Sequence, residues 1–314
     1  MSSIDASADA DLPIIAGPTG AGKSSLALRL AARHGARLIS ADSRQIYRGF
    51  DLGTAKPTAE ECRRVGHDGI DIAEPTERWS AARWASDADR WIAEARARRQ
   101  PVIVVGGTGL WLRALVQPLA AEPPMDPARR HDLQRELAEM PTEELRRWVE
   151  RLDPPRARFG RAQLLRAAEV ALLTGTRLSD HHAAAAGAAR PRRTARWLIV
   201  DPGPVLAAQL DARRAAMVAA GWVAEVERLA ATVPADAPAW NACGYRAIRE
   251  MVRGTHSLAE ALDAVRIATR QYAKRQRTWF RNQLTGVGPV TRLDPRAADA
   301  DTQVERWFTH GVQT

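Results

Sequence analysis

The sequence predicts an α/β protein in which helices cover a parallel sheet. Near the N-terminus, a short apolar run, a glycine-rich turn and a helical pattern follow one another, and the same order recurs after residue 100. Residues 120–194 instead carry helical patterns with no strand signal. The chain is therefore expected to consist of an α/β core, 12–119 and 195–290, with an all-helical insertion domain over 120–194.

The first half of the core begins with a strand over Leu12–Ala16 and a helix over Ser24–His34, which Gly35 closes. A second strand, ARLISADS, ends at Asp42 and Ser43, and the following IYRGFDLGTAKPT has the Gly, Thr and Pro content of a loop. Each of these segments is short and bounded by turn residues, as the units of a parallel sheet usually are.

A helix from about Ala81 to Arg99 precedes PVIVVGGTG, a strand that ends in glycines and leads into the helical pattern LWLRAL. Ligands bind at the carboxyl ends of parallel strands. The three strand ends that carry GPTGAGKS, ADS and GGTG are therefore expected to form the ligand site.

The insertion contains three helical patterns, PARRHDLQRELAEM, TEELRRWVERL and QLLRAAEVALL, and closes with GTRLSDHHAAAAGAARPRR, which has the composition of a loop. The sheet is expected to resume at Arg196–Pro202, followed by a helix around Ala207–Leu229 and a long helix from about Leu258 to Gln283. The ends are predicted to be a disordered N-terminus over 1–11 and a C-terminal tail over 291–314.

The stretch GPTGAGKS meets the pattern G-x-x-x-x-G-K-[ST] between a strand and a helix. Its glycines let successive backbone N–H groups converge on anionic oxygens, and the helix N-terminus adds partial positive charge. Lys23 adds a point charge, and the Ser24 hydroxyl can ligate Mg²⁺. The pattern predicts a polyphosphate site without naming what the polyphosphate carries. Its residues are Gly17, Pro18, Thr19, Gly20, Ala21, Gly22, Lys23 and Ser24.

Asp42 and Thr108 are expected to face the same crevice from two other strand ends. The spacing leaves three roles open for Asp42: a turn cap, a magnesium ligand through water, or a general base on an acceptor. Thr108 is placed to hydrogen-bond whatever group Asp42 contacts.

The net charge of +9 favours an anionic partner such as nucleic acid. Five basic residues of the last long helix are spaced by three or four and would form one stripe: Arg266, Arg270, Lys274, Arg277 and Arg281. Val265, Ala268, Tyr272 and Trp279 would dock the opposite face. A solvated arginine face is the alternative, but the charge and the insertion together favour contact with a phosphate backbone.

Several classes of protein are disfavoured by the sequence. Cys62 and Cys243 lie outside any metal-ligand spacing. The first eleven residues lack a signal-peptide core, and no window approaches the roughly 18 apolar residues of a membrane span. A cytoplasmic protein without a membrane partner is expected.

Taken together, these blocks resemble the tRNA dimethylallyltransferases, which prenylate the adenosine next to the anticodon. The resemblance runs in order from about residue 12 to 285. It rests on GPTGAGKS, ISADSRQIYRGFDLGTAKPT, VVGGTGLWLRAL, RAAEV, CGYR and TRQYAKRQRTWFR. The block DSRQIYRGFDLGTAKP is far more specific than the phosphate loop alone.

The resemblance implies a P-loop kinase-like fold and a monomer whose loop holds the diphosphate of dimethylallyl diphosphate. The dimethylallyl group would move to N6 of the adenosine, with Mg²⁺ as cofactor. Asp42 would take the amine proton, Thr108 would position the amine, and Thr19 and Arg213 would complete the catalytic set.

By the same resemblance, the insertion helps to grip the tRNA anticodon stem-loop. The implied tRNA-binding residues are Asp42, Ser43, Arg44, Gln45, Thr108, Arg130, Ala162, Gln163, Leu164, Leu165, Arg166, Cys243, Gly244, Tyr245, Arg246, Arg270, Lys274, Arg277 and Arg281. Phe159, Gly160 and Gln163 stand where the family usually has an Asn-Asp pair and an arginine, so the grip of the insertion differs there.

Two other functions use the same features. A small-molecule or nucleotide kinase would use the same loop, but it would gain little from the basic stripe and leaves ADSRQIY unexplained. An RNA-binding protein with a vestigial loop would not need Lys23, Ser24, Asp42 and Thr108 together.

Overall fold

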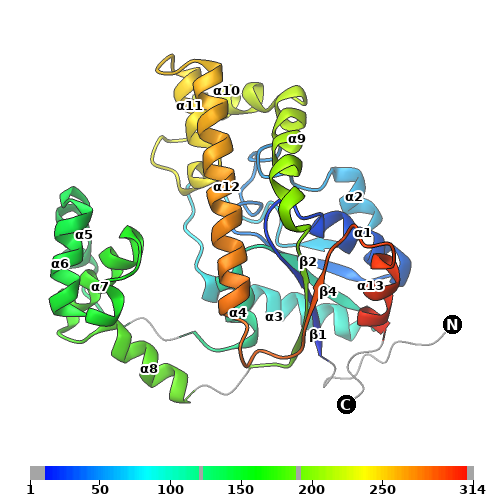
Figure 1. Ribbon diagram of the computed structural model, residues 1–314, viewed down its shortest axis with the longest axis horizontal. Helices are drawn as coiled ribbons and strands as arrows, with labels where there is room; N and C mark the ends of the chain where they lie inside the picture. The colour runs from blue at the N-terminus through cyan, green and yellow to red at the C-terminus, as the bar shows by residue number, and fades with distance from the viewer. Residues whose placement is uncertain (1–10, 120–122, 189–191, 310–314) are drawn as a thin grey trace. The chain divides into compact units, whose positions relative to one another are not determined.

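A computed structural model describes residues 11–119, 123–188 and 192–309 (Figure 1). The chain divides into two compact units, one formed by Met1–Gln117 with Pro191–Thr314 and the other by Pro118–Arg190. The predicted disordered N-terminus lies outside the described residues, apart from residue 11.

The first unit is built on a six-stranded parallel sheet in the order β3-β2-β4-β1-β5-β6. The strands are β1 (Leu12–Ala16), β2 (Arg37–Ala41), β3 (His67–Asp68), β4 (Val102–Gly106), β5 (Ala195–Val200) and β6 (Val290–Leu293). β1 and β4 pair with Ile14 opposite Val104, and both strands are buried along their whole length. Burial of both faces is why these strands are continuous apolar runs instead of alternating ones.

Helices of the first unit pack on this sheet and on one another. They are α1 (Lys23–His34), α2 (Ala59–Arg64), α3 (Ala81–Ala97), α4 (Gly109–Val116), α9 (Leu206–Ala219), α10 (Trp222–Thr232), α11 (Tyr245–Val252), α12 (Leu258–Asn282) and α13 (Ala300–Thr309). α1 packs on sheet residues such as Leu38, Ile103 and Leu198. α3 and α4 pack against each other, with Trp84 stacked on Trp111 at 5.3 Å between ring centroids. The predicted α/β core is confirmed.

The helix predicted around Ala207–Leu229 is wrong as a single element, because it is two helices, α9 and α10. Gly221 separates them with φ 99°, in the left-handed region that side chains other than glycine rarely adopt. Apolar periodicity continues on both sides of the break, so the pattern alone did not reveal it.

The predicted tail over 291–314 is also wrong for its described part. β6 extends the sheet beside β5, and α13 lies against α1 (Figure 1). Val304, Trp307 and Phe308 are buried there, at the three- and four-residue spacing of one helix face. A short polar sequence thus contributes to the core through a few well-spaced apolar side chains. Residues 310–314 lie outside the described part.

The second unit contains helices and no strand among its described residues, with α5 (Pro127–Glu139), α6 (Thr142–Leu152), α7 (Arg161–Thr174) and α8 (Leu178–Ala188). It has its own core, which includes Leu145, Val149 and Leu164. α8 corrects the predicted loop in GTRLSDHHAAAAGA: alanine has the highest helix propensity, and the buried Asp153 carboxylate accepts from the Ser179 N–H at 3.0 Å near the start of the helix.

Candidate active site

The carboxyl ends of β1, β2 and β4 converge, as predicted, on one region of the first unit. Two adjoining pockets lie there and share Thr19, Asp42, Thr54 and Arg213 in their linings. One of them is also lined by Gly20, Gly22, Lys23, Ser24 and Gln276. The structure therefore brings the phosphate loop, Asp42 and the predicted Arg213 to a single site.

The phosphate loop has the geometry that its glycines predict. Gly20 and Gly22 have φ of 78° and 85°, and a Cβ on Gly17 would lie 2.2 Å from the Val200 carbonyl oxygen. α1 begins at Lys23 with no side chain capping its N-terminus. Its first N–H groups and the positive end of its dipole are thereby directed at an anion site.

Lys23 is buried, with 8% of its surface exposed, and its Nζ donates to the Pro18 carbonyl oxygen at 2.7 Å. Burial lowers the pKa of Lys23 to about 8; Asp42 opposes this shift and Arg213 adds to it. A phosphate group placed beside the ammonium would stabilise its charged form and raise this pKa again. Lys23 is thus a cation at neutral pH, and among the described residues its ammonium forms no ion pair with a carboxylate.

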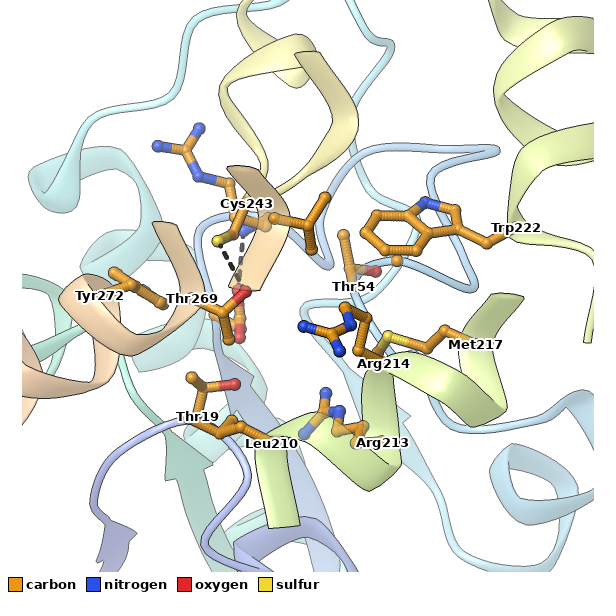
Figure 2. Close-up of a pocket in the computed structure, with 14 residues that line it drawn as sticks. Thr19, Thr54, Leu210, Arg213, Arg214, Met217, Trp222, Cys243, Thr269 and Tyr272 are labelled. Carbon is orange, nitrogen blue, oxygen red and sulfur yellow. Dashed lines mark hydrogen bonds between the residues drawn. The ribbon is translucent and has the colours of Figure 1, made fainter. Parts of the chain in front are cut away.

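Arg213 extends from α9 towards the same site (Figure 2). Burial lowers the pKa of its guanidinium, and Asp42 acts in the opposite direction. A guanidinium remains protonated under all ordinary conditions. The buried Lys23 and the partly buried Arg213 therefore line one pocket, an arrangement that favours binding of a multiply charged anion.

Asp42 follows β2 directly, and its Oδ1 accepts from the Arg44 N–H at 2.9 Å. One predicted role, the turn cap, is therefore present. The cap uses one carboxylate oxygen, and the side chain also lines both pockets. A carboxylate held in this way is oriented towards the space in which a ligand would bind.

Thr108 is connected to the Asp42 strand end. Its Oγ1 accepts from the Ser43 N–H at 3.1 Å, and its own N–H donates to the Ala41 carbonyl oxygen at 3.2 Å. Tyr272 of α12 lines one of the pockets together with Asp42; burial, followed by the nearby Asp42 carboxylate, raises the pKa of its phenol. Tyr272 was predicted only as a docking residue, so its place in the lining of the site was missed.

The other pocket has an apolar wall. Leu210, Met217, Trp222 and Val265 line it together with Thr19 and Asp42 (Figure 2). Trp222 begins α10, immediately after the glycine that separates α9 from α10. The break between those two helices therefore helps to shape this pocket, which can accept a hydrocarbon group next to the phosphate loop.

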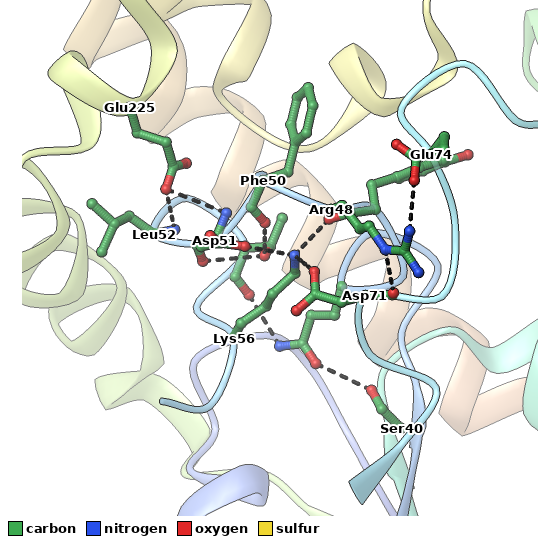
Figure 3. A network of polar contacts seen from close by, with 12 residues as sticks. Ser40, Arg48, Phe50, Asp51, Leu52, Lys56, Asp71, Glu74 and Glu225 are labelled. Atoms are coloured by element: carbon green, nitrogen blue, oxygen red, sulfur yellow. Dashed lines mark hydrogen bonds and ion pairs between the residues drawn. The ribbon is translucent and has the colours of Figure 1, made fainter. Parts of the chain in front are cut away.

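The block DSRQIYRGFDLGTAKP forms a loop that polar side chains hold in place (Figure 3). The side chain of Lys56 is only 4% exposed. Its Nζ donates to the Tyr47 carbonyl oxygen and to the carboxylates of Asp51 (2.6 Å) and Asp71. Lys56, one of three lysines in the chain, is thus a clamp within the loop instead of a ligand-binding group.

A buried carboxylate holds the same loop from α10. Glu225 accepts from the Leu52 N–H at 2.8 Å and from the Tyr245 hydroxyl at 2.6 Å. The Tyr245 oxygen in turn accepts from the Gly53 N–H at 3.1 Å. Glu225 was missed because the loop that it holds is remote from it in sequence.

These contacts correct part of the predicted tRNA-binding set. Tyr245 is fully buried, and Gln45, 9% exposed, donates to the Thr54 and Ala55 carbonyl oxygens and accepts from the Ser40 hydroxyl. Leu164 is likewise fully buried in the core of the second unit. Tyr245 and Leu164 have no exposed side-chain surface to present to RNA, so they support the fold. Gln45 holds its loop through these hydrogen bonds and lines the pocket of the phosphate loop.

Other predicted contacts stay at the surface. Ser43, Arg44, Cys243 and Gly244 are partly exposed, and Arg246 is exposed. In the second unit, Ala162 and Gln163 are exposed and Leu165 is partly exposed, whereas Arg130 and Arg166 both pair with the buried carboxylate of Glu169. The two arginines therefore neutralise a buried acid in addition to any contact with RNA.

The basic stripe of α12 is less uniform than predicted. Arg266 pairs with Asp263 at 2.9 Å and Arg270 with Asp211 at 2.6 Å. The half-buried Arg277 pairs with Asp201 at 2.9 Å. Lys274 and Arg281 are exposed. Spacing on α12 could not reveal carboxylates that α9 and the end of β5 bring to the stripe.

Gln276 was also missed. It lies four residues after Tyr272 and three before Trp279, on the face of α12 that docks into the core, and it lines the pocket of the phosphate loop. A polar residue on an otherwise docking face was the signal that could have identified it, because a buried amide requires partners.

A parallel sheet with a phosphate loop after β1 and a carboxylate after β2 defines a P-loop protein of the α/β class. Comparison with known proteins gives the family. The sequence matches the IPP transferase family over residues 45–283 and the isopentenyl transferase family over residues 10–70. The chain belongs to the IPP transferase family.

Its relatives match along most of their length. A tRNA dimethylallyltransferase of Geobacter metallireducens is 42% identical over 275 residues, which cover 86% of this chain and 89% of the relative. A tRNA dimethylallyltransferase from an Anaeromyxobacter species is 43% identical over 277 residues, 87% of this chain and 92% of the relative. The crystal structure of the Bacillus halodurans tRNA isopentenylpyrophosphate transferase has a TM-score of 0.67 at 30% identity, with 96% of each chain covered.

Proposed function

We propose that this protein is a tRNA dimethylallyltransferase, which transfers a dimethylallyl group from dimethylallyl diphosphate to N6 of the adenosine next to the anticodon. One observation carries the proposal: the phosphate loop, the Asp42 carboxylate and an apolar wall line adjoining pockets that share Thr19, Asp42 and Arg213. A prenyl diphosphate has a charged and an apolar end, and this site has a matching surface for each.

The reaction follows from these groups. The bond from the allylic carbon to the diphosphate oxygen breaks, and its electron pair leaves with the diphosphate. The adenine N6 forms a bond to the same carbon and loses one proton. Asp42 accepts that proton as general base, and Thr108, hydrogen-bonded beside it, helps to position the amine.

The leaving group gains charge as the bond breaks. Loop amides at the start of α1, together with Lys23 and Arg213, are directed at that charge within a largely buried site. Donors that are already in place need no reorganisation during the reaction, so they stabilise the transition state more than water would. A kinase would make the same use of the loop, but it has no need of the apolar wall.

Mg²⁺ fits the donors that the site offers. The exposed Ser24 hydroxyl and the Asp42 carboxylate provide oxygen ligands at the pocket. Within the described part of the chain, no group of three or more His, Cys, Asp or Glu residues could cage a metal. Mg²⁺ commonly binds through one or two protein oxygens, substrate phosphates and water. When bound at Ser24, it would neutralise charge on the diphosphate.

tRNA is the acceptor, and we assign its anticodon stem-loop to the exposed basic residues of α12 and to the exposed start of α7 in the second unit. Among the described helices, none is long and apolar enough to cross a bilayer. We further propose that the protein acts as a monomer in the cytoplasm.

The proposal is tested by mixing the protein with radiolabelled dimethylallyl diphosphate, Mg²⁺ and unmodified tRNA, and counting label in acid-precipitable RNA. Transfer of label is expected. A parallel reaction with labelled ATP is the control for the kinase alternative. Consumption of ATP without transfer of the prenyl label would contradict the proposal.

Diphosphate affinity is expected to fall as pH rises above about 8. Lys23 has a pKa of about 8 in the free protein, and a bound anion raises it. Binding therefore takes up a proton above pH 8, and affinity falls by up to tenfold per pH unit until the raised pKa is reached. Calorimetric titrations with inorganic diphosphate between pH 7 and 9 measure this.

Lys23→Met is the control for that measurement, because the diphosphate itself also titrates in this range. The variant should bind more weakly throughout and should retain only the pH dependence of the ligand. If wild type and Lys23→Met showed the same pH dependence of diphosphate affinity, the proton taken up on binding would belong to a group other than Lys23.

Replacing Lys274 and Arg281 with glutamine is expected to weaken tRNA binding and reduce its salt dependence. Each lost phosphate contact lowers the slope of log affinity against log salt by about 1. Filter binding at several salt concentrations measures the slope. Arg266→Gln is the matched control on the same helix, since Arg266 already pairs with Asp263. Equal slopes for the double variant and wild type would show that these residues of α12 do not contact the RNA phosphates.

A further inference from the structure

Gln276 places a polar side chain in the core of the first unit. It is 6% exposed, and the other buried residues of the 25-residue α12 are Ala261, Val265, Ala273 and Phe280. Burial of an amide without partners costs several kcal/mol, so buried amides are almost always hydrogen-bonded. The hydrogen-bond partners of Gln276 therefore indicate which parts of the protein this buried amide holds together.

Both ends of the Gln276 amide are used. Its Oε1 accepts from the Thr19 N–H at 2.7 Å, and its Nε2 donates to the Gly107 carbonyl oxygen at 2.9 Å. One partner is a donor and the other an acceptor, so the amide has one satisfactory orientation. Gly107 permits the approach, because a Cβ there would lie 2.3 Å from Nε2.

The two partners belong to the two loops that are proposed to hold the two substrates. Thr19 is part of the phosphate loop, which holds the leaving group. Gly107 immediately precedes Thr108, which bonds to Ser43 beside the proposed base. The Gln276 side chain thus fixes the spacing between the loop for the diphosphate and the loop that positions the acceptor amine.

The same stretch of α12 is anchored on other parts of the site. Arg277 pairs with Asp201 and also donates to the Gly203 carbonyl oxygen. Trp279 packs so closely on Gly109 that a Cβ there would lie 2.3 Å from its ring. A shift of α12 on binding of RNA to its exposed side would therefore be transmitted through Gln276 to both loops.

We propose that Gln276 is a positioning residue that couples the two substrate sites, so that tRNA and diphosphate each strengthen the binding of the other. This inference rests on the proposed function, because it requires that both ligands bind. Coupling of this kind is reciprocal, and its usual size is about 5- to 150-fold in affinity.

The coupling is measured with inorganic diphosphate, which cannot react. Its dissociation constant is determined with and without saturating unmodified tRNA, and the ratio is the coupling factor. Wild type is expected to bind diphosphate at least about fivefold more tightly with tRNA. Gln276→Met, which keeps the length but loses both hydrogen bonds, should have a ratio near one and a lower kcat. Its affinities for each ligand alone should stay within about threefold of wild type.

Two further variants separate positioning from a purely structural role. Gln276→Glu keeps an acceptor for the Thr19 N–H but loses the donor to Gly107, so it should also lose coupling while remaining nearly isosteric. Gln271→Met alters an exposed glutamine of the same helix and should retain the wild-type ratio. A purely structural role would lower the melting temperature and leave the ratio unchanged.

The inference is overturned if wild type shows no coupling, or if Gln276→Met or Gln276→Glu retains the wild-type ratio. Gln276→Glu is nearly isosteric with glutamine, so it keeps the inference testable if Gln276→Met does not fold. Failure of the proposed function is recognised separately, since wild-type protein would then transfer no prenyl label to tRNA.

Discussion

Asp42→Asn is expected to lower kcat by about 100- to 10,000-fold, the usual contribution of a general base. Asparagine keeps the oxygen that accepts from the Arg44 N–H, so the turn after β2 should persist. It cannot accept the proton that adenine N6 loses when the new bond forms. Affinities for tRNA and for dimethylallyl diphosphate should stay within a few-fold. Single-turnover transfer of label, with enzyme in excess, measures the chemical step.

Two further variants are compared with Asp42→Asn. Asp42→Ala removes both the turn cap and the base, and it should be at least as inactive as Asp42→Asn. Ser43→Ala keeps the N–H that donates to Thr108 at 3.1 Å and loses only the longer 3.4 Å hydrogen bond from the Thr108 hydroxyl, so it should retain most activity. Near-normal turnover by Asp42→Asn would show that another group takes the proton, and the site would then have to be reassigned.

Lys23→Met is expected to lower kcat by about 100- to 1,000-fold, as does removal of one preorganised donor to developing charge in other enzymes. The ammonium is buried at the phosphate loop, and methionine matches its length without its charge. Diphosphate affinity should fall as well, because Lys23 also binds the ground-state anion. Steady-state kinetics, together with calorimetry of inorganic diphosphate, separates the two effects.

Lys23→Arg tests whether charge alone is sufficient. A guanidinium is planar and larger than an ammonium, and the Nζ of Lys23 sits 2.7 Å from the Pro18 carbonyl oxygen in a closely packed loop. Activity well below that of wild type is therefore expected even though the charge is kept. Circular dichroism confirms folding of both variants. Full activity of Lys23→Arg would mean that the site needs only a positive charge.

The candidate site was predictable where its geometry is local in sequence. The octapeptide Gly17–Ser24 contains its own turn, helix start and cation, and Asp42 and Thr108 each follow an apolar strand closely. Parallel strands place their carboxyl ends at one edge of the sheet, so three motifs that are separate in the sequence could be assigned to one site. The family resemblance along most of the chain added the substrate class.

Burial and pairing were not predictable in the same way. Tyr245 and Gln45 belong to motifs that suggested RNA contact, but they hold the loop around Thr54. Arg270 and Arg277 belong to a regular basic stripe, but α9 and the end of β5 supply carboxylates to them. Spacing along one helix defines which residues share a face, whereas the partners of that face come from distant segments.

The sequence by itself determined the strand-loop-helix order, the phosphate loop and the carboxylate beside it, because those features depend on neighbouring residues. Only the tertiary structure placed Gln276 at the site, joined α13 to the core and separated α9 from α10. Gln276 meets Thr19 across 257 residues of chain. Contacts over such distances depend on how whole elements pack, and packing is decided by the complete fold rather than by any single segment.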